Sequence, residues 1–591
     1  MPTLQEAIKL EAKEASERGS SSQSPSYARY FTCANVIKDA NGKYENCTKR
    51  PSSTCGKCAL VKKSKECETF VWVDERFQYC SKKCQIDHWP RHREDCNHEL
   101  LKKDWMPTWH REKRVPMLTF NMRNIQSGYG KFLWGNVPAY DVLQLAKNEG
   151  REYDKDLSLC FGASGDLRNM IMTINALHPT YKGRCTSVVN DREEFVAARN
   201  TILLILALTL SPDEAPEAML HVWYSARLTP KIASRLREKV KPMVADVIQK
   251  IQNKNDTTIL AKTWTSGNAT ISVRLYKPQW DFVLKMLETR STVEMTEKKR
   301  KYIVMNKDDL DHHERRWWDF SGPLRLSERK FLETGILLPF GHCIDDFTIP
   351  NVTLFDPDNN NWSLEELASV RAGYDWNEIC VCGGGFVPIL DMNGRQFSFV
   401  FHMLQEFCDR LQKLSLSLIL YQCEASRFSK TISQVPQAEK YFDRIEVSNI
   451  ADTCHLGLEE TLRSFAPMLK RPSENTHATL LMLSQTPVLQ ARLARGPQWD
   501  QKQASAQWDK IMAYRGAPLN KDISINHPAY IQSDSARALV LDNVELFDYY
   551  WTKMINAEAI ATRTGMCERK VNKIIEKWPI CKETDPQKRF L

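Results

Sequence analysis

The chain has 591 residues, of which 42% are hydrophobic, 10% aromatic and 26% charged, values typical of a folded globular protein. This composition excludes a disordered or fibrous chain, and the length predicts about two to four folding units. The formal charge of +9 is a small difference between 82 basic and 73 acidic residues, so it gives only weak support for a nucleic-acid partner.

No segment of the sequence predicts membrane insertion. The longest apolar stretch, residues 201–210, is about half as long as a membrane-spanning helix and predicts a buried helix instead. The polar N-terminus has no secretory apolar segment. We therefore expect an intracellular protein, in the nucleus or the cytoplasm, without a membrane partner. In such a reducing compartment, the clustering of the 18 cysteines favours metal binding over disulfides.

The N-terminal part of the chain divides into a leader, residues 1–30, and a cysteine-rich region, residues 31–100. The leader contains the run RGSSSQSPSY, which predicts flexibility. The cysteine-rich region contains closely spaced pairs such as Cys55-x2-Cys58, which direct two ligands at one ion with little loop-closure cost. Its candidate metal ligands are Cys33, Cys47, Cys55, Cys58, Cys80, Cys84, His92 and Cys96. Eight ligands predict two zinc ions.

The segment YCSKKCQIDHWPRHREDC, residues 79–96, resembles the end of a MYND-type zinc finger position by position. In that family the ligand pairs interleave, and His88 would be a packing residue. The resemblance implies one zinc on Cys33, Cys47, Cys80 and Cys84, and the other on Cys55, Cys58, His92 and Cys96. The separation of Cys33 from Cys47 is longer than in the family, so Cys67 is an alternative first ligand.

The ligand set indicates what these ions do. All coordination positions are filled by protein atoms, which leaves none open for water or substrate, so we expect both zinc ions to be structural. Their binding would contribute roughly 10 kcal/mol or more to folding. The resemblance implies that the finger binds a partner protein through a short proline-containing peptide.

A strand, a glycine turn and a helix follow in residues 130–215. The strand runs into the turn Gly162-Ala-Ser-Gly165-Asp166, and a second strand ends at Asp191 before another helix. Glycines allow a ligand to approach a helix N-terminus, and an acidic residue after the second strand usually holds ribose hydroxyls. Many strand-to-helix turns use glycines for geometry alone. The pattern therefore makes this turn a candidate cofactor site.

Two later strands end in polar residues, Glu424 and Asn449. Because the carboxyl ends of parallel strands meet at one edge of a sheet, we expect these residues to lie near the glycine turn. The predicted cofactor-binding residues are Gly162, Gly165, Asp166, Asp191, Glu424 and Asn449. No catalytic residue is predicted.

The order of these segments is similar to a class I S-adenosylmethionine-dependent methyltransferase fold. The runs GASGDLRNMIMTI and VVNDREEFVAARNTILL look like the uncharacterised domain that accompanies MYND fingers in many fungal proteins and occurs in an axonemal dynein assembly factor. The resemblance implies a Rossmann-like α/β domain with S-adenosylmethionine as a further candidate cofactor. Its parts are residues 130–215 and 411–500, separated by a mixed, mostly helical insertion at 216–410 and followed by a helical region at 501–591.

Three functions from different classes remain open. The turn lacks the tighter Gly-x-Gly-x-Gly pattern, and Ser448-Asn449 offers no Asn-Pro-Pro-Tyr substrate clamp, so the sequence favours an interaction adaptor on a methyltransferase-like scaffold. The alternatives are an S-adenosylmethionine-dependent methyltransferase and a DNA-binding regulator. The regulator would use Ala561, Gly565 and Val571, which have helix-turn-helix spacing, although a plain helical hairpin has the same spacing.

Overall fold

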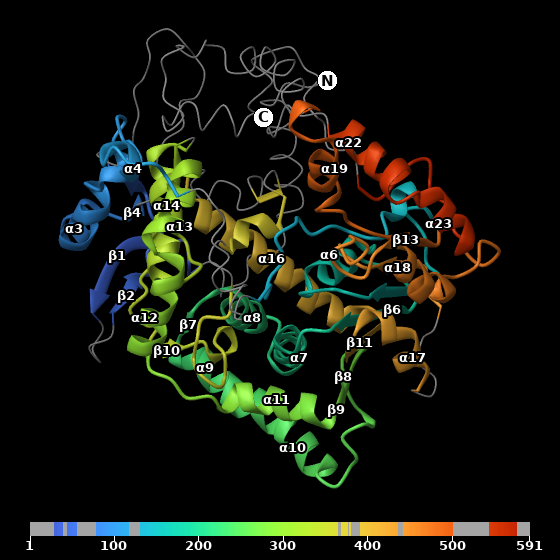
Figure 1. Ribbon diagram of the computed structural model, residues 1–591. Coiled ribbons are helices and arrows are strands. Elements are labelled where there is room, and N and C mark those ends of the chain that lie inside the picture. Colours follow the sequence, from blue (N-terminus) through green and yellow to red (C-terminus); the bar gives the residue numbers. More distant parts are fainter. Residues whose placement is uncertain are drawn as a thin grey trace. The chain divides into compact units, whose positions relative to one another are not determined.

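The computed structural model describes residues 29–38, 44–55, 78–117, 131–318, 320–364, 368–375, 378–379, 390–434, 441–499 and 543–575. The chain forms two compact units, each assembled from separate stretches of sequence (Figure 1). Unit 1 comprises Met1–Ala139, Ile202–Gln249 and Asp281–Asp409, and unit 2 comprises Tyr140–Thr201, Lys250–Trp280 and Arg410–Leu591. The domain boundaries drawn from the sequence stay a prediction.

Unit 2 is built on a seven-stranded sheet with the order β13-β12-β5-β6-β11-β9-β8. Neighbouring strands are parallel except for the antiparallel hairpin of β8 and β9. The strands are β5 (Leu157–Phe161), β6 (Cys185–Asp191), β8 (Ile259–Ser266), β9 (Ala269–Tyr276), β11 (Leu416–Gln422), β12 (Arg444–Glu446) and β13 (Thr479–Leu481). Because β5 is buried on both faces, it consists mainly of apolar residues, as parallel strands usually do. The predicted α/β fold is confirmed.

The strand order places a topological switch point between β5 and β12. The chain forms β6 beside β5, next the β8–β9 hairpin at the sheet edge, and then β11 between β6 and β9. It then returns to the other side of β5 to form β12 and β13. Leu157 and Leu416 both pair with Cys185, so β5, β6 and β11 begin level with one another. Open α/β sheets bind ligands outside the carboxyl ends of strands at such a point. The β8–β9 hairpin falls in the region predicted as an insertion, yet it extends this sheet beyond β11.

Helices connect the strands of the sheet and also follow its last strand, β13, in unit 2. The helices are α6 (Arg168–Ala176), α17 (Phe428–Ser433), α18 (Leu458–Phe465), α19 (Pro487–Arg495), α22 (Val544–Tyr549) and α23 (Ala557–Arg563). Phe428 of α17 and Phe465 of α18 pack on Cys160, Val188 and Ile445 of the strands. This apolar cluster therefore covers one face of the sheet at the switch point.

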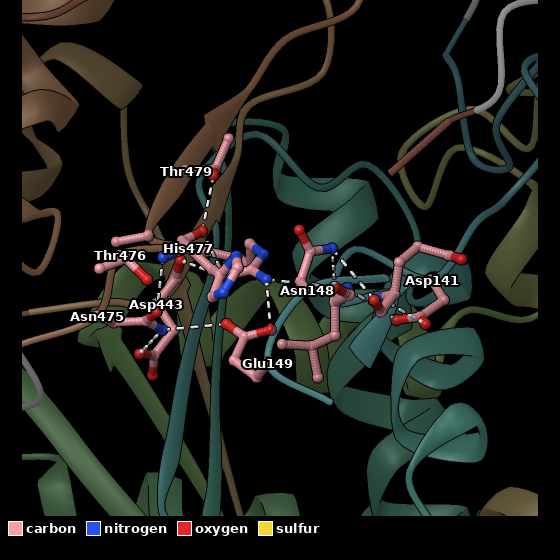
Figure 2. Close-up of polar contacts among 12 residues, drawn as sticks. Asp141, Asn148, Glu149, Asp443, Asn475, Thr476, His477 and Thr479 are labelled. Carbon is pink, nitrogen blue, oxygen red and sulfur yellow. Dashed lines mark hydrogen bonds and ion pairs between the residues drawn. The ribbon is translucent and has the colours of Figure 1, made fainter. Parts of the chain in front are cut away.

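A buried polar network lies at the amino-terminal ends of the strands in unit 2. The side chains of Arg444 and Glu149 are nearly inaccessible to solvent and form an ion pair of 2.8 Å. Asn475 points between two carboxylates and donates to Glu149 at 3.1 Å and to Asp443 at 2.8 Å (Figure 2). Burial alone would raise the pKa of Glu149, but the hydrogen bond and charge of Arg444 lower it. The network thus joins the loop before β5 to the start of β12.

Unit 1 is mainly helical, with several short strands. Its strands are β1 (Cys33–Lys38), β2 (Tyr44–Cys47), β3 (Ser53–Thr54), β4 (Gln78–Tyr79), β7 (Arg227–Leu228) and β10 (Ile349–Pro350). Its helices include α3 (Lys82–Cys96), α4 (Thr108–Arg111), α8 (Ala215–Tyr224), α9 (Pro230–Arg235), α12 (Val293–Val304), α13 (Lys307–Trp317) and α14 (Gly322–Thr334). The helices α13 and α14 lie beside the cysteine-rich region that contains β1 and α3 (Figure 1).

Four helices contain residues of both units: α7 (Glu194–Thr209), α10 (Lys241–Ile251), α11 (Lys277–Glu288) and α16 (Met392–Lys413). The longest apolar stretch of the sequence lies almost entirely in α7, as expected for a helix. Within the described part of the chain, no helix combines the length and the apolar character needed to cross a membrane.

Candidate metal centre and sheet-edge site

Seven of the eight predicted metal ligands gather into two groups in unit 1, and the ligand atoms of each group lie within 4.8 Å of one another. The first group is Cys33, Cys47, Cys80 and Cys84, and the second is Cys55, His92 and Cys96. The eighth predicted ligand, Cys58, and the alternative ligand Cys67 lie outside the described residues. The two groups are interleaved in the sequence, because the ligands of one group lie both before and after Cys55 of the other. They form two possible metal sites.

The first group lies where a hairpin meets the start of a helix. Cys33 at the beginning of β1 pairs with Cys47 at the end of β2, so the hairpin brings these two thiols together. Cys80 directly follows β4, and Cys84 lies in the first turn of α3. The helix begins there because the Ser81 hydroxyl accepts a hydrogen bond from the Cys84 N–H at 3.2 Å. Local secondary structure therefore places all four sulfur atoms.

The geometry of the first group fits a tetrahedral metal ion. The Sγ atoms of Cys47 and Cys80 are 3.9 Å apart, and those of Cys80 and Cys84 are 3.5 Å apart. Four thiolates bound to zinc at about 2.3 Å would have their sulfur atoms about 3.8 Å apart. Burial raises the pKa of the Cys33 thiol to about 12, so this thiol needs a bound cation to lose its proton near neutral pH.

The second group uses one face of α3. His92 and Cys96 are four residues apart, so they lie on the same side of the helix, where both are buried with Cys55. His88, one turn earlier, has a different partner, because its Nδ1 lies 3.0 Å from the Tyr79 hydroxyl. Burial lowers the pKa of His88 to about 4, which keeps this ring neutral. Nitrogen and sulfur donors in such sites are typical of zinc.

The cysteines of the two groups belong to a larger core of unit 1. Their apolar neighbours come from beyond the cysteine-rich region and include Trp317 of α13 and Leu326 of α14. Lys330 of α14 also forms an ion pair of 2.8 Å with Asp95 of α3. The Cys343 N–H donates to the Asn46 side chain at 2.8 Å, close to Cys47. The cysteine-rich region is thus packed into unit 1, which the spacing of its ligands did not indicate.

At the edge of the sheet, the candidate cofactor residues mostly bond to one another or to the backbone. Asp191 accepts hydrogen bonds from the N–H groups of Gly165 at 2.8 Å and Glu193 at 2.9 Å. Asp166 is buried and pairs with Arg168 at 2.7 Å. These carboxylates therefore hold the glycine turn in place. Burial raises the pKa of Asp191, although both hydrogen bonds oppose this shift.

The space beside the first glycine of the turn is filled. A Cβ atom added to Gly162 would lie 2.4 Å from Cε1 of Phe465, so the phenylalanine ring packs directly on the glycine. Asn190 fixes the same turn, because its Nδ2 donates to the Gly162 carbonyl at 2.9 Å and to the Cys423 carbonyl at 3.0 Å. A small residue at position 162 is therefore required by side-chain packing.

The remaining two candidates lie after their strands as predicted. Glu424 is exposed and precedes a short 3-10 helix that follows β11. Asn449 is half-buried, and its Nδ2 lies 3.3 Å from His455 Nε2 and 3.4 Å from Gln485 Oε1. Hydrogen bonds thus join Gly165 to Asp191 and Gly162 to the neighbouring Asn190. By contrast, the polar contacts of Asn449 are with the loop that follows β12 and with Gln485.

A further acidic residue at this edge was missed in the sequence. Glu446 ends β12 with only 1% of its surface exposed, and its Oε1 accepts a hydrogen bond from the Ser448 N–H at 2.7 Å. Among the described residues its Oε2 has no hydrogen-bond partner. Burial raises its pKa to about 7. The signal available in the sequence was a carboxylate between the apolar residues Ile445 and Val447, although the short strand β12 also buries Arg444.

Comparison with known proteins finds one match, which covers part of the chain. Residues 133–228 match a family described as a domain of unknown function (DUF4470). This stretch contains β5, α6, β6 and α7, and thus the glycine turn and Asp191. No curated protein and no solved structure gives a significant match to the chain.

We expect removal of metal to unfold more than the cysteine-rich region. Metal analysis should find two zinc ions per chain, and Cys47→Ala should lower this number by one. Chelation should redden the tryptophan fluorescence, because the buried Trp105 and Trp317 share a core with the ligands. Cys185→Ala removes a buried thiol outside both groups and should leave the zinc content unchanged. Full zinc content in Cys47→Ala would contradict the first site.

We expect Glu446 to make stability depend on pH. Its folded pKa of about 7 lies above the usual value of 4.5, so its contribution to stability is present below pH 4.5 and lost as the pH rises to 7. Glu446→Gln should raise the free energy of unfolding at pH 8 by up to about 3 kcal/mol and change it little at pH 4.5. The measurement is urea unfolding at both pH values. An equal change in the free energy of unfolding at the two pH values would contradict the raised pKa of Glu446. The same pH dependence in Glu424→Gln, the control at an exposed residue, would also contradict it.

Proposed function

We propose that the cysteine-rich region is a MYND-type zinc finger that binds a proline-containing peptide of a partner protein, and that unit 2 is a methyltransferase-like scaffold without turnover. The observation that carries this proposal is the pair Ile86 and Trp89. These side chains are 60% and 38% exposed on α3, the helix that also contributes candidate metal ligands.

The helix α3 presents two different faces. Cys84, His88, His92 and Cys96 recur every four residues and face the metal groups and the core. Ile86 and Trp89 are three residues apart and both exposed, so they form a single apolar surface. Trp89 lies at the border of the ligand face, because it is three residues from His92 and its ring contacts the His92 ring. Exposed aromatic side chains on a rigid support are typical of protein-binding sites, because little conformational entropy is lost when a partner binds. We infer that zinc holds this surface ready for a ligand.

A proline-containing peptide suits such a surface. Its extended conformation is largely formed before binding, and its proline rings pack well on aromatic side chains. The ring of Trp89 has an edge-to-face contact with His92, with 5.6 Å between the ring centroids. Since His92 is a candidate metal ligand, this contact supports a fixed position for the indole.

The scaffold assignment for unit 2 is supported by the order of its strands and by the packing at the sheet edge. Five parallel strands in the order β11-β6-β5-β12-β13 follow the doubly wound pattern of class I methyltransferases. However, Phe465 occupies the space beside Gly162, and Asp191 is engaged by two backbone N–H groups. A bound cofactor would have to displace the ring and take over the carboxylate, which favours a scaffold over an enzyme.

The DNA-binding alternative is less well supported. Helix α23 ends at Arg563, and Gly565 then adopts a left-handed conformation with φ of 71°. A helix-turn-helix motif needs a second helix after this turn. Residues 566–575, the last part of the chain that the structure describes, contain no helix. This arrangement does not supply a recognition helix in that segment.

We expect Trp89→Ala to weaken peptide binding without loss of zinc. Fluorescence anisotropy with short labelled peptides, each containing one or two prolines beside apolar residues, should detect micromolar binding by the full chain. Trp89→Ala should lower the affinity at least about tenfold, a typical effect for a central aromatic contact. Tyr302→Ala, which removes an aromatic side chain that is 72% exposed elsewhere in unit 1, should have no effect. Equal binding by both variants would contradict the proposed surface.

We expect no binding of S-adenosylmethionine or S-adenosylhomocysteine in isothermal calorimetry of the zinc-loaded protein. The reason is that the ring of Phe465 and the hydrogen bonds of Asp191 occupy the space and the groups that a cofactor would use. Micromolar binding that is lost in Asp191→Ala, but kept in Glu424→Gln, would contradict this expectation and favour the methyltransferase alternative.

A further inference from the structure

We propose that the peptide bound by α3 carries an acidic residue on each side of its apolar, proline-containing centre, with the two acidic residues about five positions apart. This inference rests on the proposed function and specifies the chemistry of the partner. It depends on two basic side chains, Lys82 and Arg93, which lie at the two ends of the surface formed by Ile86 and Trp89.

The four side chains form one line along the helix. Lys82, Ile86, Trp89 and Arg93 are separated by four, three and four residues, so they lie on the same side of α3. All four are exposed. A cation therefore stands at each end of the line, and the two apolar side chains lie between them. We call this line the α3 stripe.

Both cations of the α3 stripe are available for a ligand. Within the described part of the chain, neither Lys82 nor Arg93 forms an ion pair, and Lys82 only donates to the neutral side chain of Gln85 at 3.0 Å. By contrast, Arg91 of the same helix pairs with Asp345 at 2.9 Å and packs on Tyr44. The helix thus uses one arginine for its own structure and leaves the ends of the stripe exposed.

The first turn of α3 adds to the positive potential at one end. It contains Lys82 and Lys83 and no acidic residue. The amino terminus of a helix itself carries a partial positive charge, which is why acidic residues are usually preferred there. Basic side chains in this position are unfavourable for the isolated helix, but they attract a carboxylate of a ligand. The charge pattern therefore complements an acidic residue at this end of the peptide.

The spacing of the two cations sets the spacing of the acidic residues. Lys82 and Arg93 are eleven residues apart, which corresponds to about 16 Å along a helix axis. An extended or polyproline peptide advances about 3.1–3.3 Å per residue, so about five residues span this distance. Three or four residues of such a peptide can contact Ile86 and Trp89 while its two carboxylates reach the cations.

A peptide fits the stripe better than a nucleic acid does. The basic residues Lys82, Lys83, Arg91 and Arg93 of α3 are nearly balanced by Asp87, Glu94 and Asp95. A nucleic-acid backbone usually requires a continuous basic surface. Here the centre of the stripe is apolar, which matches an apolar peptide core and offers nothing to a phosphate.

The test compares three labelled peptides with the same proline-containing core, bound to the full, zinc-loaded chain. One has two aspartates five positions apart, one has asparagines there, and one has lysines. In fluorescence anisotropy at about 50 mM salt, the acidic peptide should bind at least tenfold more tightly than the neutral one, and the difference should shrink at about 300 mM salt because exposed charges are screened.

Variants identify the side chains responsible. The double substitution Lys82→Glu with Arg93→Glu should weaken binding of the acidic peptide at least tenfold, leave the neutral peptide nearly unchanged, and create a preference for the lysine peptide. The matched control is Lys103→Glu with Lys301→Glu, which reverses two exposed charges elsewhere in unit 1 and should change none of the three affinities.

The outcomes separate this inference from the proposed function. If the acidic and neutral peptides bind the unaltered chain equally, and both depend on Trp89, the finger docks peptides but the role of Lys82 and Arg93 is wrong. If no peptide binds, both proposals are overturned. Tighter, Lys82-dependent binding of a short DNA duplex than of the acidic peptide would also overturn the inference.

Discussion

The interleaved order of the candidate metal ligands is the constraint on which the cysteine-rich part of unit 1 depends. A hairpin, a strand-to-helix turn and a single helix supply ligands that alternate between two groups, so neither site can form without the other's segments being nearly in place. The short strands β3 and β4, of two residues each, would have little stability alone. Metal ions bound at these two groups would add to the apolar core that the region shares with the rest of unit 1, and they would fix both the position and the rotation of α3.

This constraint extends beyond the ligands because they share a core with α13 and α14. Trp317 and Leu326 pack on the metal-ligating cysteines, and Lys330 pairs with α3. One part of the surface of the cysteine-rich region is therefore covered by the rest of unit 1, whereas Ile86 and Trp89 stay exposed. Integration into the unit thus limits which side chains of the region are accessible, and it holds α3 more rigidly than a flexible tether would.

The parts of the fold that follow from local patterns could be predicted, and those that depend on contacts distant in sequence could not. Closely spaced cysteines and the strand–glycine–helix pattern of residues 156–176 indicate structure within short segments, and the structure contains both. The β8–β9 hairpin was not recognised as part of the sheet, because its pairing with β11 joins residues more than 140 positions apart. Glu446 was missed for a similar reason, since its burial arises from packing around the switch point.

The glycine turn illustrates how one sequence pattern serves two different purposes. A small residue after the first strand allows a ligand to approach, but it equally allows a side chain to pack there, and in this chain Phe465 takes that place. The acidic residue after the second strand shows the same ambiguity, because Asp191 bonds to the backbone of the turn that a cofactor would contact. Polar atoms that already have partners within the fold gain little from a ligand, because the ligand must first displace those partners. By this criterion the polar residues of the glycine turn stabilise unit 2 itself, and the sequence pattern alone could not distinguish this role from cofactor binding.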